Sequence, residues 1–248
     1  MWEVYVCDFK PAMHAQPFCV TVKPRISTHG LILAWEHTWS ELKSIGDGPS
    51  RLEDHTMVAW KGNLYVFGGE VSFASTGETP LWIYNIAANT WRKKWKYYSI
   101  VQPQGCRGHT AVVFRGAMHI YGGYRDLKGS SSELWSFNFD KEIWQQAILR
   151  KNAEVPTGRH DHSAVVHDSA MWVYGGMTNL QERTDFWRWD FDTKRWARIK
   201  SKGGPGELHG HTACKVFSSM LLFGGERQRQ PQEILWRFHF GLLKKKKC

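Results

Sequence analysis

The sequence predicts an all-β fold, a β-propeller built from four-stranded antiparallel blades, and two regularities indicate it. A His-Thr or His-Ser pair precedes a Gly-Gly pair four times, and the first glycine always follows 13 residues after the histidine. Tryptophans recur at intervals of 52, 53 and 52 residues. A repeat of about 50 residues is typical of propeller blades. The recurring positions are His55, His109, His162 and His211; Gly68-Gly69, Gly122-Gly123, Gly175-Gly176 and Gly224-Gly225; and Trp39, Trp91, Trp144 and Trp196.

The first complete copy reads as four short strands separated by turns. Residues 55–60 form a mixed apolar and polar strand, and residues 64–67 are aromatic and β-branched. Residues 61–63 suit a tight turn between them, because Gly and Asn tolerate a positive φ. Residues 81–86 predict a third strand and Trp91 begins a fourth, so this copy is expected to be an antiparallel meander.

The other copies repeat this order. Second strands are expected at 118–121, 171–174 and 220–223, and third strands at 134–139, 186–191 and 235–240. No stretch shows the i, i+3, i+4 spacing of a helix. The fourth copy reaches Phe240 without a further tryptophan, so it is expected to lack an outer strand of its own.

The fixed positions have physical reasons. A Gly pair at the end of a strand lets the backbone turn where a Cβ would clash. The repeated aromatic residues supply large apolar surface between neighbouring sheets. One four-stranded sheet cannot bury both of its faces alone, so blades must pack side by side around an axis. The recurring His, Gly and Trp positions are therefore interpreted as structural.

These residues resemble the kelch repeat, in which a strand-ending Gly-Gly is followed by an aromatic residue and then by Trp. The copies that match are Gly68-Gly69 with Tyr84 and Trp91, Gly122-Gly123 with Phe137 and Trp144, and Gly175-Gly176 with Trp189 and Trp196. The fourth copy has Gly224-Gly225 and Phe238 but lacks the final Trp. The resemblance covers about residues 39–240 and implies a kelch-type propeller that acts as a protein-binding scaffold.

The repeats divide the chain into three parts. Residues 1–28 match no repeat, residues 29–240 are the predicted propeller, and residues 241–248 are a basic tail. The propeller repeats are expected at about 45–95, 96–148, 149–200 and 201–240. Residues 29–44 are either the remnant of an earlier blade or a strand that closes the ring. Kelch propellers usually have more than four blades, so a partial or shortened propeller is favoured over a closed ring of four.

Composition limits the partners. The 42% apolar content and 14 tryptophans predict a folded chain. The net charge of +10 favours acidic partners, although solvated surface charge is the plainer interpretation. Nucleic acid is not favoured, because no aromatic-and-basic module is present. The longest apolar run, residues 31–35, is too short to span a bilayer. Five cysteines without a C-x-x-C pattern indicate reduced thiols, and therefore a cytoplasmic protein with the nucleus as the alternative.

The 12 histidines raise the question of a metal site. His162 and His211 each have a second His two residues earlier, His160 and His209, where the other copies have Glu53 and Arg107. If the first strands line the axis, the four recurring histidines and the four residues two positions before them are expected to form a polar ring around a channel. A residue that recurs once per blade indicates structure more than a metal site. No cofactor, metal or catalytic motif is predicted, so the chain is predicted not to be an enzyme.

Recognition is expected instead from the loops that connect the strands, held by a rigid scaffold. The candidates are cations near one face, which are suited to carboxylates of a partner: Arg51, Arg107, Arg125, Lys128, Arg159, Arg183, Arg227 and Arg229. For Arg51, Arg107 and Arg159 the competing interpretation is a structural role between blades. By resemblance, the function is binding of a polar or acidic protein segment, with substrate recognition for a ubiquitin ligase as a specific version. The alternatives are actin binding and, less favoured, a copper oxidase similar to galactose oxidase.

Overall fold

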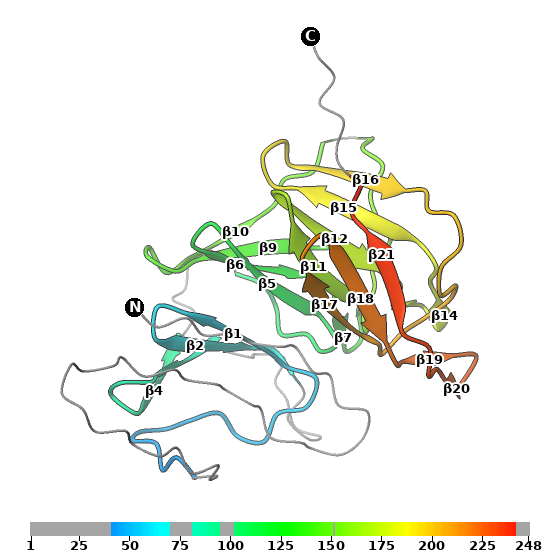
Figure 1. The fold of residues 1–248 in the computed structure, drawn as a ribbon. Coiled ribbons are helices and arrows are strands. Elements are labelled where there is room, and N and C mark those ends of the chain that lie inside the picture. The colour runs from blue at the N-terminus through cyan, green and yellow to red at the C-terminus, as the bar shows by residue number, and fades with distance from the viewer. Residues whose placement is uncertain (1–40, 70–80, 95–101, 151, 242–248) are drawn as a thin grey trace, which may run out of the picture.

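A computed structural model describes residues 41–69, 81–94, 102–150 and 152–241. Within these ranges every regular element is a β-strand, and the main strands gather into four sheets that fan around a common axis (Figure 1). The all-β propeller predicted from the repeat is confirmed. Trp39, most of residues 1–44 and the basic tail from residue 242 lie outside the described residues.

The first three sheets are the predicted four-stranded antiparallel meanders. The first contains β1 (Thr56–Trp60), β2 (Asn63–Phe67), β3 (Leu81–Asn85) and β4 (Thr90–Lys94). The second contains β5 (Thr110–Phe114), β6 (Ala117–Tyr121), β9 (Leu134–Asn138) and β10 (Ile143–Gln146). The third contains β11 (Ser163–His167), β12 (Ala170–Tyr174), β15 (Phe186–Asp190) and β16 (Arg195–Ile199). We call these sheets blades 1, 2 and 3.

Blade 4 has three strands among the described residues, which are β17 (Thr212–Val216), β18 (Ser219–Phe223) and β21 (Trp236–His239). The missing outer strand was expected from the absent tryptophan. Residues 41–44 do not supply it, because Ile45 pairs in parallel with Thr90 on the outer strand of blade 1. Residues 29–40 lie outside the described residues, so closure of the ring by that segment stays a prediction.

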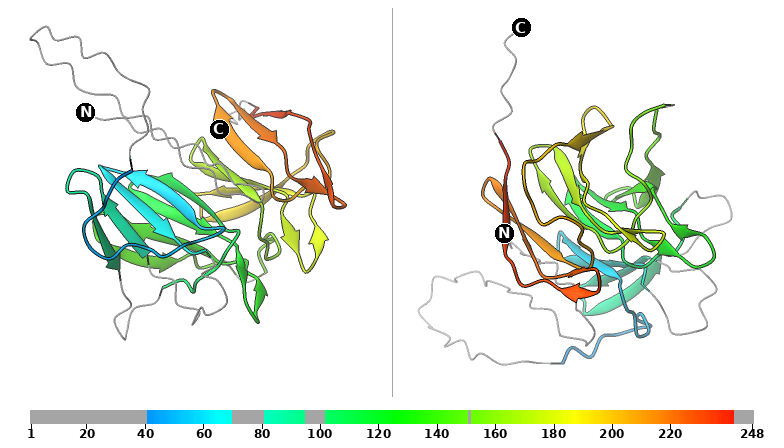
Figure 2. Two further views of the ribbon diagram at one scale, coloured as in Figure 1. Left: turned by 90° about the horizontal axis from the view of Figure 1, so that it is seen from below. Right: turned by 90° about the vertical axis from the view of Figure 1, so that its right-hand side faces the viewer.

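Small hairpins, which the sequence pattern did not predict, follow the Gly-Gly pairs of blades 2 to 4. They are β7 (Tyr124–Arg125) with β8 (Gly129–Ser130), β13 (Met177–Thr178) with β14 (Gln181–Glu182), and β19 (Glu226–Arg227) with β20 (Gln230–Pro231). They project from one end of the array (Figure 2). The pattern indicated only variable loops there, because two-residue strands carry no periodicity.

The hydrophobic core lies between blades. The first strands of successive blades are neighbours, which places them nearest the axis. A separate cluster fills each of the three joints, because each sheet has apolar residues on both faces. In the joint between blades 1 and 2, Phe67 and Ile83 pack with Met118 and Phe137. The repeated tryptophans reach across the joints: Trp144 lies 5.3 Å from the Phe67 ring, measured between ring centroids.

Each joint also contains a glycine that faces a histidine. Gly122 of blade 2 has a φ of +72°, and a Cβ there would lie 2.5 Å from the Arg159 carbonyl oxygen and 2.7 Å from Cε1 of His162, both in blade 3. Gly68 meets Cys106 and His109 in the same way, and Gly175 meets Leu208 and His211. The first glycine of these three pairs therefore allows the next blade to approach. The second glycine lies against the histidine of its own blade, and a Cβ on Gly176 would lie 2.7 Å from the His162 Cβ. That contact within each blade accounts for the regular spacing between histidine and glycine.

The histidines hydrogen-bond back to the preceding blade and do not line a channel. The Nε2 atoms of His109, His162 and His211 lie 2.7, 2.8 and 2.8 Å from the hydroxyls of Thr56, Thr110 and Ser163. All three rings are buried. The expectation of a polar ring of channel-lining side chains that includes them is therefore wrong, because these rings are buried in the joints between blades.

A chain of backbone hydrogen bonds links the residues that precede these histidines. The N–H of Gly108 donates to Asp54 O, the N–H of Asp161 to Gly108 O, and the N–H of Gly210 to Asp161 O, at 3.1, 2.7 and 2.8 Å. All four residues have a positive φ between 54° and 66°. The alternation of Asp and Gly at this position follows, because both tolerate the left-handed conformation better than most residues.

Gly224 offers a matched control for the joint, because it has the same φ of +72° as Gly122 but no atom of the described structure within 4 Å of a Cβ. We expect both Gly→Ala variants to lose about 1–2 kcal/mol to left-handed strain. Gly122→Ala should lose about 1–3 kcal/mol more from overpacking. Denaturant unfolding at low protein concentration measures the difference. Equal losses for the two variants would contradict the role assigned to the first glycine.

Candidate interaction surface

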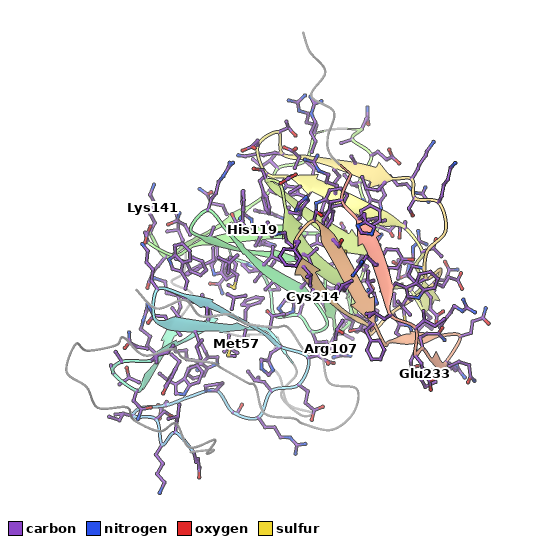
Figure 3. All side chains as sticks on the ribbon, viewed as in Figure 1. Met57, Arg107, His119, Lys141, Cys214 and Glu233 are labelled. Atoms are coloured by element: carbon purple, nitrogen blue, oxygen red, sulfur yellow. The ribbon has the colours of Figure 1, made fainter. Side chains whose placement is uncertain are left out.

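The hairpins and the segments that lead into the first strands together form one end of the array, which we call the hairpin end. Each lead-in segment bridges to the first strand of a hairpin: Arg107 pairs with Tyr124, His160 with Met177, and His209 with Glu226. The labels β7, β14, β19 and β20 lie on this side in Figure 1, and Arg107 lies there in Figure 3. The backbone therefore brings loops from three blades onto one surface.

Two leucines stand at the tips of these hairpins. Leu127 and Leu180 are fully exposed. Their φ values are 65° and 63°, and Arg229 has a φ of 62° at the tip of the blade 4 hairpin. Left-handed backbone disfavours branched side chains such as Leu, and Gly or Asn is the usual choice. Exposed apolar side chains in a strained backbone are costly to the free protein, which makes the tips candidates for contact with a partner.

Four of the predicted cations remain accessible in or near this end. Arg227 and Arg229 are exposed on the blade 4 hairpin. Lys128 is exposed beside Leu127 and donates to Gln104 Oε1 at 2.8 Å. Arg51 is exposed in the lead-in of blade 1 and lies 3.4 Å from Glu53. Exposed cations beside apolar tips are suited to a segment that carries both carboxylates and apolar side chains.

The predicted residues Arg107 and Arg183 are half-buried and already engaged. Arg107 donates to Asp126 at 2.9 Å and lies over the Tyr124 ring at 4.9 Å. The Arg183 guanidinium lies 3.8 Å from the Asp185 carboxylate. Both side chains therefore hold the lead-in and hairpin segments in place, and only parts of them face solvent.

Arg159 is fully buried, so the prediction that it contacts a partner is wrong. Its guanidinium forms a fork with Asp185, with distances of 2.8 and 2.9 Å, and also donates to Gly175 O at 2.9 Å. The Trp187 indole N–H donates to the same carboxylate at 2.5 Å. Burial alone would raise the pKa of Asp185, but the hydrogen bonds and charge of Arg159 lower it to about 2.

Blade 2 contains the same arrangement with an arginine from another place in the sequence. Trp135 Nε1 donates to Glu133 Oε2 at 2.7 Å, and Arg125 from the hairpin pairs with this carboxylate. Arg125 is thus largely structural, which differs from its predicted role in partner binding. An acidic residue two positions before a strand tryptophan is the sequence signal for this cluster, and it was missed because only blades 2 and 3 have it.

Neighbouring hairpins are joined by Glu182, another residue that the sequence pattern did not single out. Both of its carboxylate oxygens lie 2.9 Å from the backbone nitrogen of Gln228, which donates to them. His209 Nδ1 lies 3.4 Å from Glu182 Oε1. The blade 3 and blade 4 hairpins are therefore fixed relative to one another, so Leu180 and Arg229 are presented on a common support.

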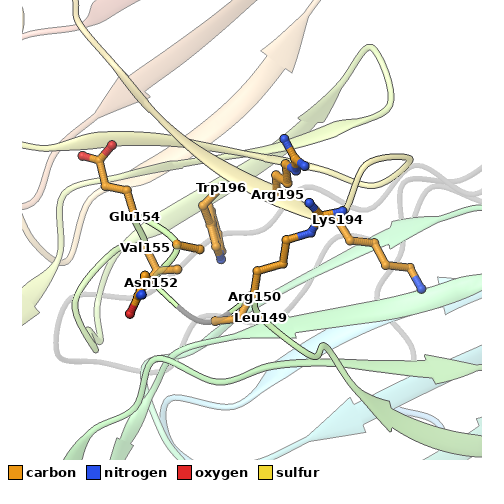
Figure 4. Close-up of a pocket in the computed structure, with 9 residues that line it drawn as sticks. Leu149, Arg150, Asn152, Glu154, Val155, Lys194, Arg195 and Trp196 are labelled. Atoms are coloured by element: carbon orange, nitrogen blue, oxygen red, sulfur yellow. The ribbon is translucent and has the colours of Figure 1, made fainter.

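A separate cavity of about 330 Å³ lies at the outer edge of blade 3 (Figure 4). Trp196 forms one wall, with Glu154 and Val155 from the linker on one side and Arg150, Lys194 and Arg195 around it. The three cations are exposed to solvent. The cavity thus lacks buried polar groups that would fix a ligand, and the hairpin end remains the stronger candidate.

The described residues contain neither a metal-binding cluster nor a candidate membrane-spanning helix. No group of three or more His, Cys, Asp or Glu side chains in that part of the chain is arranged to hold a metal ion. Nor does the described part contain a helix with the length and apolar character needed to cross a membrane.

Comparison with known proteins defines the class of this chain. The model of the KLHDC2/KLHL20/DRC7 Kelch-repeats domain matches residues 31–151 and 108–247. These matches cover most of the sequence, and the geometry above has four blades with the expected Gly-Gly and Trp positions. The chain belongs to the kelch-repeat family.

Individual relatives agree with this assignment. The chain is similar to "Putative protein tag-53" of Caenorhabditis elegans, with 32% identity over 66% of this chain and 13% of the relative. It is also similar to human "Kelch domain-containing protein 3", with 28% identity over 64% of this chain and 44% of the relative. The chain thus spans less than half of either relative. The solved "Structure of YjhT" has a TM-score of 0.59 at 22% identity over 76% of this chain and 63% of that chain, which supports the fold alone.

The Arg159–Asp185 pair leads to a prediction about acid stability. Because the folded-state pKa of Asp185 lies below its ordinary value of 3.8, the ionised carboxylate stabilises the folded state above about pH 4. That stabilisation should be lost as the pH falls toward about 2. Asp185→Asn should cost about 3–5 kcal/mol at neutral pH, since it leaves Arg159 buried without a counter-charge. The variant should also lose this part of the acid dependence.

Asp192→Asn is the matched control, because Asp192 forms an exposed pair with Arg115 on the surface. Its loss should be below about 1 kcal/mol. Urea unfolding of both variants across the acid range measures the effect. A variant at Asp185 that unfolds like the one at Asp192 would show that the buried pair does not stabilise blade 3.

Proposed function

We propose that this chain is a non-catalytic interaction module that binds a protein segment at the hairpin end. The observation that carries the proposal is the surface formed by Leu127 and Leu180 beside the exposed cations Lys128, Arg227 and Arg229. Loops held by a rigid scaffold commonly carry binding function. The kelch-repeat fold supports such a role, because the strands of its blades pack in the core while the loops between the strands differ from blade to blade.

The partner segment is proposed to combine carboxylates with apolar side chains. The exposed guanidinium groups of Arg227 and Arg229 suit carboxylates, and the two leucines suit apolar residues of the partner. Recognition of substrates for a ubiquitin ligase is one such role, and it requires a further protein or segment that recruits the ligase. We also propose a reducing compartment, cytosol or nucleus, since Cys106 and Cys214 are free thiols.

A peptide-display experiment tests this proposal with the chain as probe. Random peptides displayed on phage should be enriched for Asp and Glu next to apolar residues when they are selected on the protein. Arg227→Glu with Arg229→Glu should weaken the selected peptides about tenfold or more, because it replaces attraction with repulsion. Leu127→Ser with Leu180→Ser should weaken them as well, and fluorescence anisotropy measures both losses.

Arg195→Glu with Arg198→Glu provides a control with the same change of charge. Both residues are exposed on β16, at the outer edge of blade 3. This variant should bind the selected peptides as the unmodified chain does. Equal loss of binding in both double variants would indicate that net charge acts, and the hairpin end would then be rejected as the binding surface.

A further inference from the structure

The outer edges of blades 1, 2 and 3 differ in how they are protected. A sheet edge carries unpaired backbone N–H and C=O groups, so native proteins usually cover it or place charges along it. On blade 1 the edge is partly covered: Ile45 N–H donates to Asn89 O at 2.8 Å, and Trp91 N–H donates to Ile45 O at 3.2 Å. On blade 3 the exposed Arg195 and Arg198 lie along the edge strand β16. A covering segment and charged side chains therefore protect these two edges.

The edge of blade 2 has neither form of protection among the described residues. Its outermost strand is β10 (Figure 1), and residues 143–149, which we call the edge segment, contain no charged residue, Pro or Gly. Ile143 is 40% exposed and Ile148 is 89% exposed. Gln145 and Gln146 are exposed as well. An uncharged and partly apolar edge of this kind favours the addition of another strand.

The hydrogen bonds of blade 2 show which backbone groups of the edge segment face outward. Ala147 N–H donates to Leu134 O at the start of β9, at 2.8 Å. In an antiparallel pair only alternate residues bond to the partner strand, so the N–H and C=O groups of Trp144 and Gln146 point away from β9. No other described residue forms a backbone hydrogen bond with these groups. They are therefore available to an added strand.

Side chains of the edge segment alternate between the two faces of the sheet. Trp144 packs in the joint with blade 1. Ala147 and Leu149 pack in the joint with blade 3, so the alternation continues beyond the end of β10. Gln146 and Ile148 therefore share the face of Trp144, because every second side chain of an extended segment lies on the same side.

The edge segment is complementary to a second copy of itself in the antiparallel orientation. A two-fold axis perpendicular to the sheet makes the contact symmetric and places opposite residues on the same face. With this axis at Gln146, the two Gln146 side chains are opposite each other, and Trp144 is opposite Ile148 of the other copy. On the second face Ile143 is opposite Leu149. Aromatic and β-branched pairs across neighbouring strands stabilise a sheet, so this register uses the exposed isoleucines.

A register centred one residue earlier fits less well. With the axis at Gln145, Trp144 would lie opposite the Gln146 amide of the other copy. Ile148 would then lie opposite the charged Glu142, which belongs to the turn before β10. The register centred on Gln146 therefore matches apolar side chains with apolar side chains, and it is the one that we expect.

We propose that blade 2 pairs with blade 2 of a second copy of this chain through the edge segment. The two four-stranded sheets become one continuous eight-stranded sheet. Each copy has a single β10, so the contact uses both edges and assembly stops at two copies. Because the contact consists of one strand pair, it buries less surface than a standard interface. Association is therefore expected to be reversible and to depend on protein concentration.

Cysteine cross-linking tests the register. Opposite residues of a hydrogen-bonded antiparallel pair have Cα atoms about 5.5 Å apart, a distance that a disulfide can bridge. Diagonal neighbours are about 7–8 Å apart and are too distant. Mild oxidation should therefore link two copies of Gln146→Cys and should leave the matched control Gln145→Cys mostly unlinked. The unmodified chain, oxidised in parallel, accounts for its own cysteines, and mass spectrometry of the digest identifies the linked residues.

A charge complementation experiment tests the contact without oxidation. In sedimentation experiments the mass of the unmodified chain should rise toward twice the monomer mass as its concentration increases. Gln146→Lys and Gln146→Glu should each raise the dissociation constant several-fold, because like charges would be opposite each other at the axis. A mixture of the two variants should associate as the unmodified chain does. Both variants keep a strongly positive net charge, so general attraction between the molecules cannot produce this rescue.

Leu127→Lys, at a hairpin tip, is the control for added charge away from the edge segment, and it should leave the association unchanged. Circular dichroism melting of every variant separates loss of association from loss of folding. A folded chain that stays monomeric at every concentration and gives no Gln146→Cys cross-link would overturn the proposal. Equal cross-linking of the two cysteine variants would indicate random collision and would reject it too. Two further results would do the same: failure of the Lys and Glu variants to associate when mixed, and assemblies larger than two copies.

Discussion

The contact between the first glycine of one blade and the histidine of the next sets the geometry of the whole array. Gly122 allows the Arg159 carbonyl and the His162 ring to approach to a distance that no Cβ would permit. The ring then hydrogen-bonds to Thr110 of the preceding blade. This close approach brings the large aromatic faces of the two sheets together, so the apolar cores of the joints depend on it.

The joints leave the hairpin end free to vary because they use only the strands and the turns beside them. Arg159 with Asp185, and Arg125 with Glu133, hold lead-in and hairpin segments against the blades, and Glu182 ties one hairpin to the next. A rigid support of this kind lowers the entropy lost when a loop binds a partner. The same support allows Leu127 and Leu180 to remain in a backbone conformation that leucine rarely adopts.

The repeat made the fold predictable, because a spacing that recurs four times can only reflect a contact that recurs. Strand positions, the Gly-Gly turns and the three-stranded form of blade 4 among the described residues all followed from it. The candidate site was less predictable, because burial of a charged residue depends on its partner. Arg159 and Arg227 look alike in the sequence, yet one is buried on Asp185 and the other faces solvent. The acidic residue two positions before Trp187 marks the partner of Arg159, but only blades 2 and 3 have such a residue, so it does not stand out from the four-fold repeat.

The chain of backbone hydrogen bonds through Asp54, Gly108, Asp161 and Gly210 makes each blade an interchangeable unit. Every link uses the same donor and the same acceptor, irrespective of which side chains surround it. If a whole blade were removed or duplicated, the remaining blades could therefore be linked by the same backbone hydrogen bonds. A shorter deletion inside a blade would shift the histidine relative to its glycine and break two links at once. Evolution of such arrays by gain and loss of complete modules follows from this backbone chemistry.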